Sequence, residues 1–139
     1  MNKKRIKYLP IQNGIPKSHF GALNEDKDAC NLAFTFAEMP DGEYSVDRAD
    51  KEALAAFAKQ LKLLSPLTWK KIKQSPRHGQ GCEKIKRNCL NVNVPASVSE
   101  DAEMLAFRFY GKRVFVGFRS LEIFHILFLD TKFTLYDHE

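Results

Sequence analysis

The chain has 139 residues, of which 44% are hydrophobic and 28% are charged, and its formal net charge is +5 with a pI near 9.1. These values are those of one globular domain that can bury a core without disulfides or metals, and the positive charge favours phosphate-rich or acidic partners. No apolar run is long enough to span a bilayer and the start is too polar for a secretory signal, so we expect no membrane partner. Three cysteines without a CxxC pair, Cys30, Cys82 and Cys89, favour a reducing, cytoplasmic location.

Residues 1–28 contain two prolines, two glycines, a basic run and an acidic run, with little hydrophobic periodicity. They predict an irregular N-terminal arm, followed by a single domain over residues 29–139. This domain is expected to open with a strand, because Leu32, Phe34 and Phe36 alternate with small or polar residues.

Two helices are predicted next. Over residues 47–64, leucine and phenylalanine recur at gaps of three and four, which is the pattern of an amphipathic helix. Ser65 and Pro66 form a helix start, with serine as the cap and proline at the first helical position, and this second, basic helix is expected to end before Pro76. Residues 82–94 then contain a strand-like alternation of apolar side chains.

A hairpin is predicted from residues 104–110 and 113–119, which are joined only by Gly111 and Lys112. Pairing Tyr110 with Arg113 fixes the register and places alternate residues on opposite faces of the sheet. One face is then wholly apolar and is expected to point inward: Leu105, Phe107, Phe109, Val114, Val116 and Phe118. The other face carries Arg108, Arg113, Phe115, Gly117 and Arg119.

The last predicted strand, residues 123–129, is apolar on both parities except for His125, so it is expected to be an inner strand that is buried on both faces. The order of elements predicts an α+β fold with an N-terminal strand, two helices and then an antiparallel sheet of three to four strands.

The arginine-bearing face of the hairpin is the first candidate site. A three-residue turn after Arg119 would place His125 beside Arg108, Arg113 and Arg119, with Gly117 leaving space above them, whereas a two-residue turn would put His125 on the core face. Guanidinium groups bind phosphate in a bidentate manner, and imidazole transfers protons near neutral pH. The alternative is that the arginines form the solvated face of a half-exposed sheet and that His125 is a core residue.

The C-terminal segment is the second candidate. Lys132, Tyr136 and His138 offer a cation, a phenol and an imidazole just beyond the last strand, where active groups commonly lie. The alternative is a frayed end in which Phe133 and Leu135 are core anchors.

A basic stripe beside Trp69 is the third candidate, because lysines and arginines match a phosphate backbone and an indole ring can stack on a base. Its members are Lys70, Lys71, Lys73, Arg77, Lys84, Lys86 and Arg87, with Arg119 added from the sheet. The alternative is a solvated helix face. The spacing of His78, Cys82 and Cys89 matches no common zinc site, so we expect no metal and no cofactor.

The order of elements, together with segments 105–119 and 124–132 and the tyrosine at position 136, resembles the RelE/ParE-like toxin superfamily over about residues 30–138. The resemblance implies a strand, two helices and an antiparallel sheet. It also implies a toxin of a toxin–antitoxin system that cuts mRNA as a metal-independent endoribonuclease, with RNA or the ribosome and an antitoxin protein as partners.

Carried over to this chain, the family's arginine after the second-strand turn is Arg113, its basic position beyond the last long strand is Lys132, and its C-terminal tyrosine is Tyr136. In this hypothesis Arg113 and Arg108 clamp the scissile phosphate, His125 or Tyr136 deprotonates the ribose 2′-hydroxyl, and Lys132 stabilises developing charge. Two alternatives stay open. The chain is also similar to small proteins of bacterial mobile elements, which allows a non-enzymatic nucleic-acid- or protein-binding module, and the family's other branch poisons gyrase.

Overall fold

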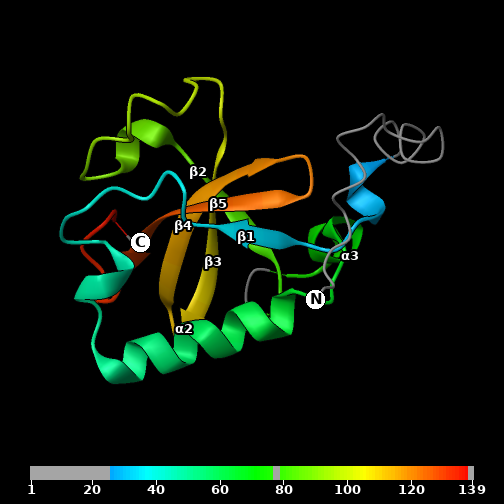
Figure 1. Ribbon diagram of the computed structural model, residues 1–139, viewed down its shortest axis with the longest axis horizontal. Helices are drawn as coiled ribbons and strands as arrows, with labels where there is room; N and C mark the ends of the chain where they lie inside the picture. The colour runs from blue at the N-terminus through cyan, green and yellow to red at the C-terminus, as the bar shows by residue number, and fades with distance from the viewer. Residues whose placement is uncertain (1–25, 77–78, 138–139) are drawn as a thin grey trace, which may run out of the picture.

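The structure is a computed structural model that describes residues 26–76 and 79–137. These residues form a five-stranded mixed sheet with the strand order β1-β5-β4-β3-β2, and two α-helices (Figure 1). The α-helices and strands are β1 (Ala33–Thr35), α2 (Lys51–Leu64), α3 (Trp69–Gln74), β2 (Cys82–Ile85), β3 (Met104–Tyr110), β4 (Arg113–Ser120) and β5 (Ile123–Asp130). Short 3-10 helices are η2 (Lys27–Ala29), η3 (Val46–Arg48) and η4 (Arg87–Cys89).

The predicted α+β class is confirmed, but the prediction of an antiparallel sheet of three to four strands is wrong. β1 pairs in parallel with β5, while the other neighbours are antiparallel. The connection between these two parallel strands is long, as a parallel pair requires, and it contains both helices and the strands β2, β3 and β4. Residues 1–25 of the predicted arm lie outside the described residues.

The hairpin of β3 and β4 contains a bulge that changes the predicted register. Tyr110 pairs with Arg113 as predicted, but Phe109 is an extra residue on β3, so Arg108 pairs with Val114 and Phe107 pairs with Phe115. Because an extra residue shifts every later pair by one, the predicted division into an apolar and an arginine-bearing face is wrong.

Both faces of the sheet are in fact covered by a hydrophobic core. On one face, α2 and α3 contribute Phe57 and Trp69 to a cluster that includes Phe107 and Phe115, whose rings lie 5.3 Å apart. Phe115, predicted to face outward, is therefore fully buried. A second cluster on the opposite face includes the following residues: Ile85, Leu90, Val98, Met104, Val114, Val116, Leu127, Phe128, Leu135 and Tyr136.

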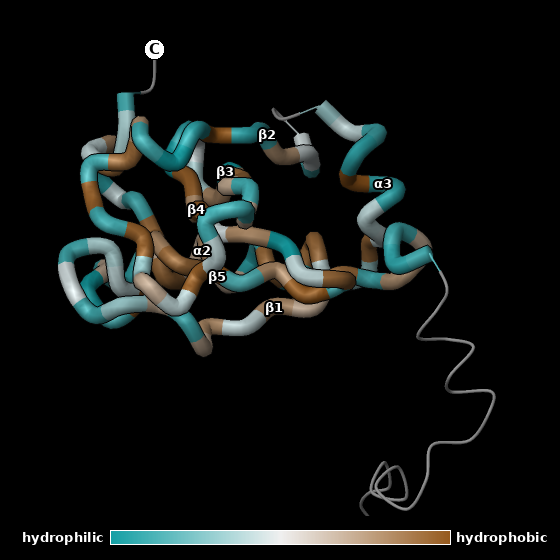
Figure 2. The backbone as a smooth tube through the Cα atoms, turned by 90° about the horizontal axis from the view of Figure 1, so that it is seen from above, coloured by the Kyte–Doolittle hydropathy of each residue, from teal (hydrophilic) through white to brown (hydrophobic). Residues whose placement is uncertain are grey.

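The two layers can be followed in the figures. α2 lies along one side of the sheet, and the segment between β2 and β3 extends on the opposite side (Figure 1). Hydrophobic residues, shown in brown, are frequent in the strands, whereas much of α3 is hydrophilic (Figure 2). β5 is an inner strand with buried residues on both faces, as predicted.

Three predicted boundaries differ from the structure. α2 begins at Lys51 after a cap at Asp50, whose carboxylate accepts a hydrogen bond from the Ala53 amide. α3 is capped by the hydroxyl of Thr68 and not by Ser65, which ends α2. The predicted alternation of Leu90, Val92 and Val94 forms no strand: these residues pack in or against the second core cluster, and the strand of this segment is β2, which precedes them.

Within residues 26–76 and 79–137, neither α-helix has the length and apolar character that a membrane-spanning helix needs.

Candidate nucleic-acid interface

A cleft of about 450 Å³ opens between α3 and the face formed by β2, β3 and β4. Nine residues line it: Trp69, Ile72, Lys73, Ser75, Cys82, Lys84, Glu103, Leu105 and Arg119. Three of these side chains are cations and one is an anion, so the lining is positively charged. Such a cleft suits a ligand that carries negative charge.

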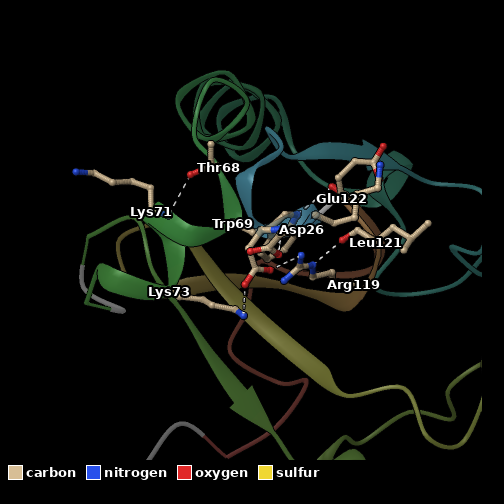
Figure 3. Close-up of polar contacts among 10 residues, drawn as sticks. Asp26, Thr68, Trp69, Lys71, Lys73, Arg119, Leu121 and Glu122 are labelled. Atoms are coloured by element: carbon tan, nitrogen blue, oxygen red, sulfur yellow. Dashed lines mark hydrogen bonds and ion pairs between the residues drawn. The ribbon is translucent and has the colours of Figure 1, made fainter. Parts of the chain in front are cut away.

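α3 forms one wall because its side chains divide between two environments. Trp69 and Ile72, three residues apart and hence on one side of the helix, are buried in the first core cluster. Lys70, Lys71 and Lys73 are exposed. Lys73 reaches toward the sheet, whereas Lys71 extends away from Arg119 (Figure 3). The helix therefore directs one of its three lysines into the cleft.

Arg119 forms the floor of the cleft and is held in one orientation. Its guanidinium carbon lies 4.5 Å from the centre of the Trp69 ring, and its Nε donates a hydrogen bond of 2.6 Å to the carbonyl of Leu121. The indole N–H of Trp69 in turn donates to the carbonyl of Glu122, at 3.0 Å. A guanidinium that is stacked and hydrogen-bonded in this way keeps its remaining N–H groups directed at a ligand.

Asp28 lies between two cations of the cleft. Its Oδ2 is 2.7 Å from Lys73 Nζ, and its Oδ1 is 2.6 Å from Arg119 Nη2. The hydrogen bond from Lys73, and to a smaller extent the one from Arg119, lowers the pKa of the Asp28 carboxyl below its ordinary value. The carboxylate therefore stays ionised and shows where these two cations bind an anion.

The opposite wall carries a thiol and an exposed ion pair. Burial, with a smaller contribution from the charge of Glu103, raises the pKa of Cys82 to about 11. Cys82 is therefore a neutral thiol at pH 7, and it is not a nucleophile there. Lys84 and Glu103 lie 3.2 Å apart and are both exposed, so each can exchange its partner for a ligand.

The structure does not gather the three arginines of the predicted arginine-bearing face at one point. Arg113 and Arg119 lie near opposite ends of β4, six residues apart, which is roughly 20 Å for an extended strand. Arg113 donates from Nε to the carbonyl of Thr131 at 2.9 Å, and its guanidinium lies 4.9 Å from the ring centre of Tyr110. Arg108 is half-buried on β3, in the pair with Val114 next to the bulge.

His125 is not among the arginines either. The turn after β4 has two residues, with Leu121 in the left-handed conformation at φ 58°, so His125 pairs with Phe118. The rings of His125 and Phe118 stack at 4.4 Å, and the buried Nδ1 atom of His125 has no hydrogen-bond partner in the described part of the chain. Gly117 leaves no space above a site, since a Cβ atom there would lie 1.8 Å from the carbonyl oxygen of His125.

Two of the C-terminal candidates, Lys132 and Tyr136, lie beyond the end of β5, where the carbonyl of Thr131 accepts a hydrogen bond from Arg113. Tyr136 is only 9% exposed and packs in the second core cluster, while Lys132 is exposed beside a small polar hollow. Asp130 is fully buried and accepts hydrogen bonds from three backbone N–H groups of the segment that follows it. This segment is therefore an ordered turn and not a frayed end. His138 lies outside the described residues.

The predicted basic stripe is only partly gathered. Lys73, Lys84 and Arg119 line the cleft, whereas Arg87 donates two hydrogen bonds to backbone carbonyls of residues 98 and 99. Arg77 lies outside the described residues. Trp69 is only 1% exposed, so it supports Arg119 and does not offer a free ring to a base.

Sequence reasoning missed Asp28 and Glu103, and it considered Cys82 only as a zinc ligand. Asp28 belonged to a segment interpreted as an irregular arm, and its partners lie far along the chain, so no local pattern marks it. Across residues 26–76 and 79–137, no three or more histidine, cysteine or acidic side chains converge in a way that could hold a metal ion.

Comparisons with known proteins add no further assignment: no protein-family model, no curated protein and no solved structure matches this chain.

Proposed function

We propose that this protein binds single-stranded RNA in the cleft between α3 and the sheet, and that it acts as a RelE-type toxin that cuts mRNA without a metal. The observation that carries the proposal is the convergence of Lys73, Lys84 and Arg119 on one cleft. Three cations along a groove are the arrangement that neutralises successive phosphates of a nucleic acid.

The size of the cleft favours a single strand. A volume of about 450 Å³ is in the range of small-ligand sites and holds a nucleotide, whereas a double helix is too wide to enter it. The element order, a strand, two helices and then antiparallel strands, also supports the toxin class that the sequence resembles.

Cleavage would use attack of a ribose 2′-hydroxyl on the adjacent phosphorus. A base takes the hydroxyl proton, an acid returns a proton to the leaving 5′-oxygen, and cations stabilise the charge on the phosphate. The cleft offers Glu103 as the base, Lys84 as the acid, and Arg119 with Lys73 as the phosphate clamp. These roles replace the set formed by Arg108, Arg113, His125, Lys132 and Tyr136, because His125 is stacked on Phe118 and Tyr136 is buried in the second core cluster.

A second candidate is a protein that binds RNA without cutting it. It is favoured by the absence of an imidazole from the lining of the cleft among the described residues, because histidine is the most common general acid or base.

Expression in bacteria tests the proposal. The wild-type protein is expected to arrest growth and to cleave transcripts, and both effects should disappear in the triple variant Lys73→Ala, Lys84→Ala, Arg119→Ala. A matched control removes three positive charges from exposed positions of α2 outside the cleft: Lys51→Ala, Lys59→Ala and Lys62→Ala. Thermal unfolding checks that each variant folds.

Three results would contradict the proposal or redirect it. Undiminished toxicity of the folded cleft variant would show that the cleft is not the site. RNA binding with intact transcripts would select the non-cleaving protein. Intact transcripts together with DNA damage would select a gyrase poison.

A further inference from the structure

We propose that the point between Lys73 Nζ and Arg119 Nη2 is a phosphate subsite of the cleft, and that Asp28 occupies it as an internal competitor which RNA displaces. The inference rests on the proposed RNA binding and adds to it a specific contact and a means of regulation.

The two oxygens of Asp28 reproduce how a phosphate would bind. One oxygen is 2.7 Å from the Lys73 ammonium and the other is 2.6 Å from the Arg119 guanidinium, so two cations from different elements converge on one anion. Lys73 and Arg119 reach this point from α3 and β4, in front of Trp69 (Figure 3). Carboxylate and phosphate oxygens accept hydrogen bonds from these groups in the same geometry.

The subsite persists without Asp28. The stack of Arg119 on Trp69 and its hydrogen bond to the carbonyl of Leu121 both come from the sheet side and do not involve the carboxylate. The Arg119 side chain is 20% exposed, and that of Lys73 is 60% exposed. A ligand can therefore reach both cations once the carboxylate leaves.

The element that carries Asp28 is weakly attached. η2 contains no buried residue, and apart from those of Asp28 its ion pair is a long one, 3.9 Å between Lys27 and Glu122 in the turn after β4. Among the described residues, the first backbone hydrogen bond from this segment to the rest of the domain is at Cys30, whose carbonyl accepts from the amide of Trp69, and Leu32 is the first residue that enters the core. η2 can thus move away without disturbing the core.

A phosphate has an advantage in this exchange. The ion pairs of Asp28 are only partly buried, so water and salt screen them and reduce their contribution to stability. A phosphodiester brings the same negative charge, and a neighbouring phosphate in the strand reaches the remaining cation of the cleft, Lys84. RNA therefore binds three cations at once where Asp28 binds two.

The test compares the variants Asp28→Asn and Asp41→Asn. Asp41 is an exposed residue in the segment after β1, so its replacement changes the net charge equally without touching the cleft. With a fluorescein-labelled single-stranded RNA oligonucleotide as the probe, fluorescence anisotropy should show about tenfold tighter binding for Asp28→Asn and less than about twofold for Asp41→Asn.

Trp69 provides a second measurement, because it is the only tryptophan in the chain and lies beneath Arg119. Inorganic phosphate should change its emission at a lower concentration in Asp28→Asn than in the wild type.

The outcomes separate this inference from the proposed function. If Asp28→Asn binds RNA no more tightly than Asp41→Asn, while loss of Lys73 or Arg119 still weakens binding, the competitor is refuted and the RNA cleft stands. If binding is independent of Lys73 and Arg119, both proposals fail.

Discussion

The salt dependence of RNA binding gives a quantitative test of the cleft. Each phosphate of a single strand that a protein neutralises contributes about −0.7 to the slope of log K against log salt concentration. Lys73, Lys84 and Arg119 together predict a slope of about −2, which is a loss of roughly 20-fold in affinity between 50 and 200 mM salt. Salt also weakens the competing pairs with Asp28 and Glu103, so this slope is the steepest that the three cations can produce.

Single substitutions measure how much each cation contributes to that slope. Lys84→Ala should reduce its magnitude by about 0.7 and weaken binding equally for different RNA sequences, because contacts to phosphate carry no sequence information. The assay is anisotropy of a labelled RNA oligonucleotide over a series of KCl concentrations, with Lys62→Ala on α2 as the control. Equal slopes for the two variants and the wild type would refute the assignment of phosphate contacts to this cleft.

Three predictions concern the scaffold and the thiol of the cleft. Gly117→Ala should destabilise the fold by about 3 kcal/mol or more in denaturant unfolding, because the added Cβ atom meets the backbone of His125, and unchanged stability would show that β4 and β5 separate easily. Asp130→Ala should cost about 3 kcal/mol or more in the same assay, since three backbone N–H groups lose their acceptor, and the loss should be far smaller if water replaces the carboxylate. At pH 8, iodoacetamide should modify the exposed Cys89 much faster than Cys82, as mass spectrometry of the peptides can show. Folding raises the pKa of Cys82 from 9.0 to about 11, so the unfolded chain loses the thiol proton at a lower pH than the folded protein does. The free energy of unfolding should therefore fall by at most about 2 kcal/mol as the pH rises from 9 to 11, and Cys82→Ser should abolish this fall.

The spacing of hydrophobic residues correctly predicted those elements whose burial follows from local sequence alone. Phe57 and Leu64 lie on the buried side of α2, and the connection at Gly111 joins two strands as expected. The division of the hairpin into faces failed for a physical reason. Because both faces of the sheet are covered, Phe107 and Phe115 are buried on either choice of register, and the hydrophobic pattern alone does not distinguish a bulged hairpin from a regular one.

The candidate site was predictable only in part. Lys73, Lys84 and Arg119 were selected by their charge, and the structure places all three in one cleft although they come from three different elements. Asp28 was not predicted, since its pair with Lys73 joins residues 45 positions apart. The position of His125 depended on the turn before it, where Leu121 adopts a left-handed conformation that is uncommon outside glycine and asparagine.

The parallel pairing of β1 with β5 determines when the cleft can form during synthesis and folding. The two strands are about 90 residues apart in sequence, so β1 has no neighbour until β5 has been synthesised. Pairs that are so distant form slowly and late in folding. The cleft depends on the same late region, because Arg119 and the Glu122 carbonyl that fixes Trp69 lie just before and within the turn that leads to β5. The cleft therefore cannot form in a nascent chain before the residues of β5 have left the ribosome.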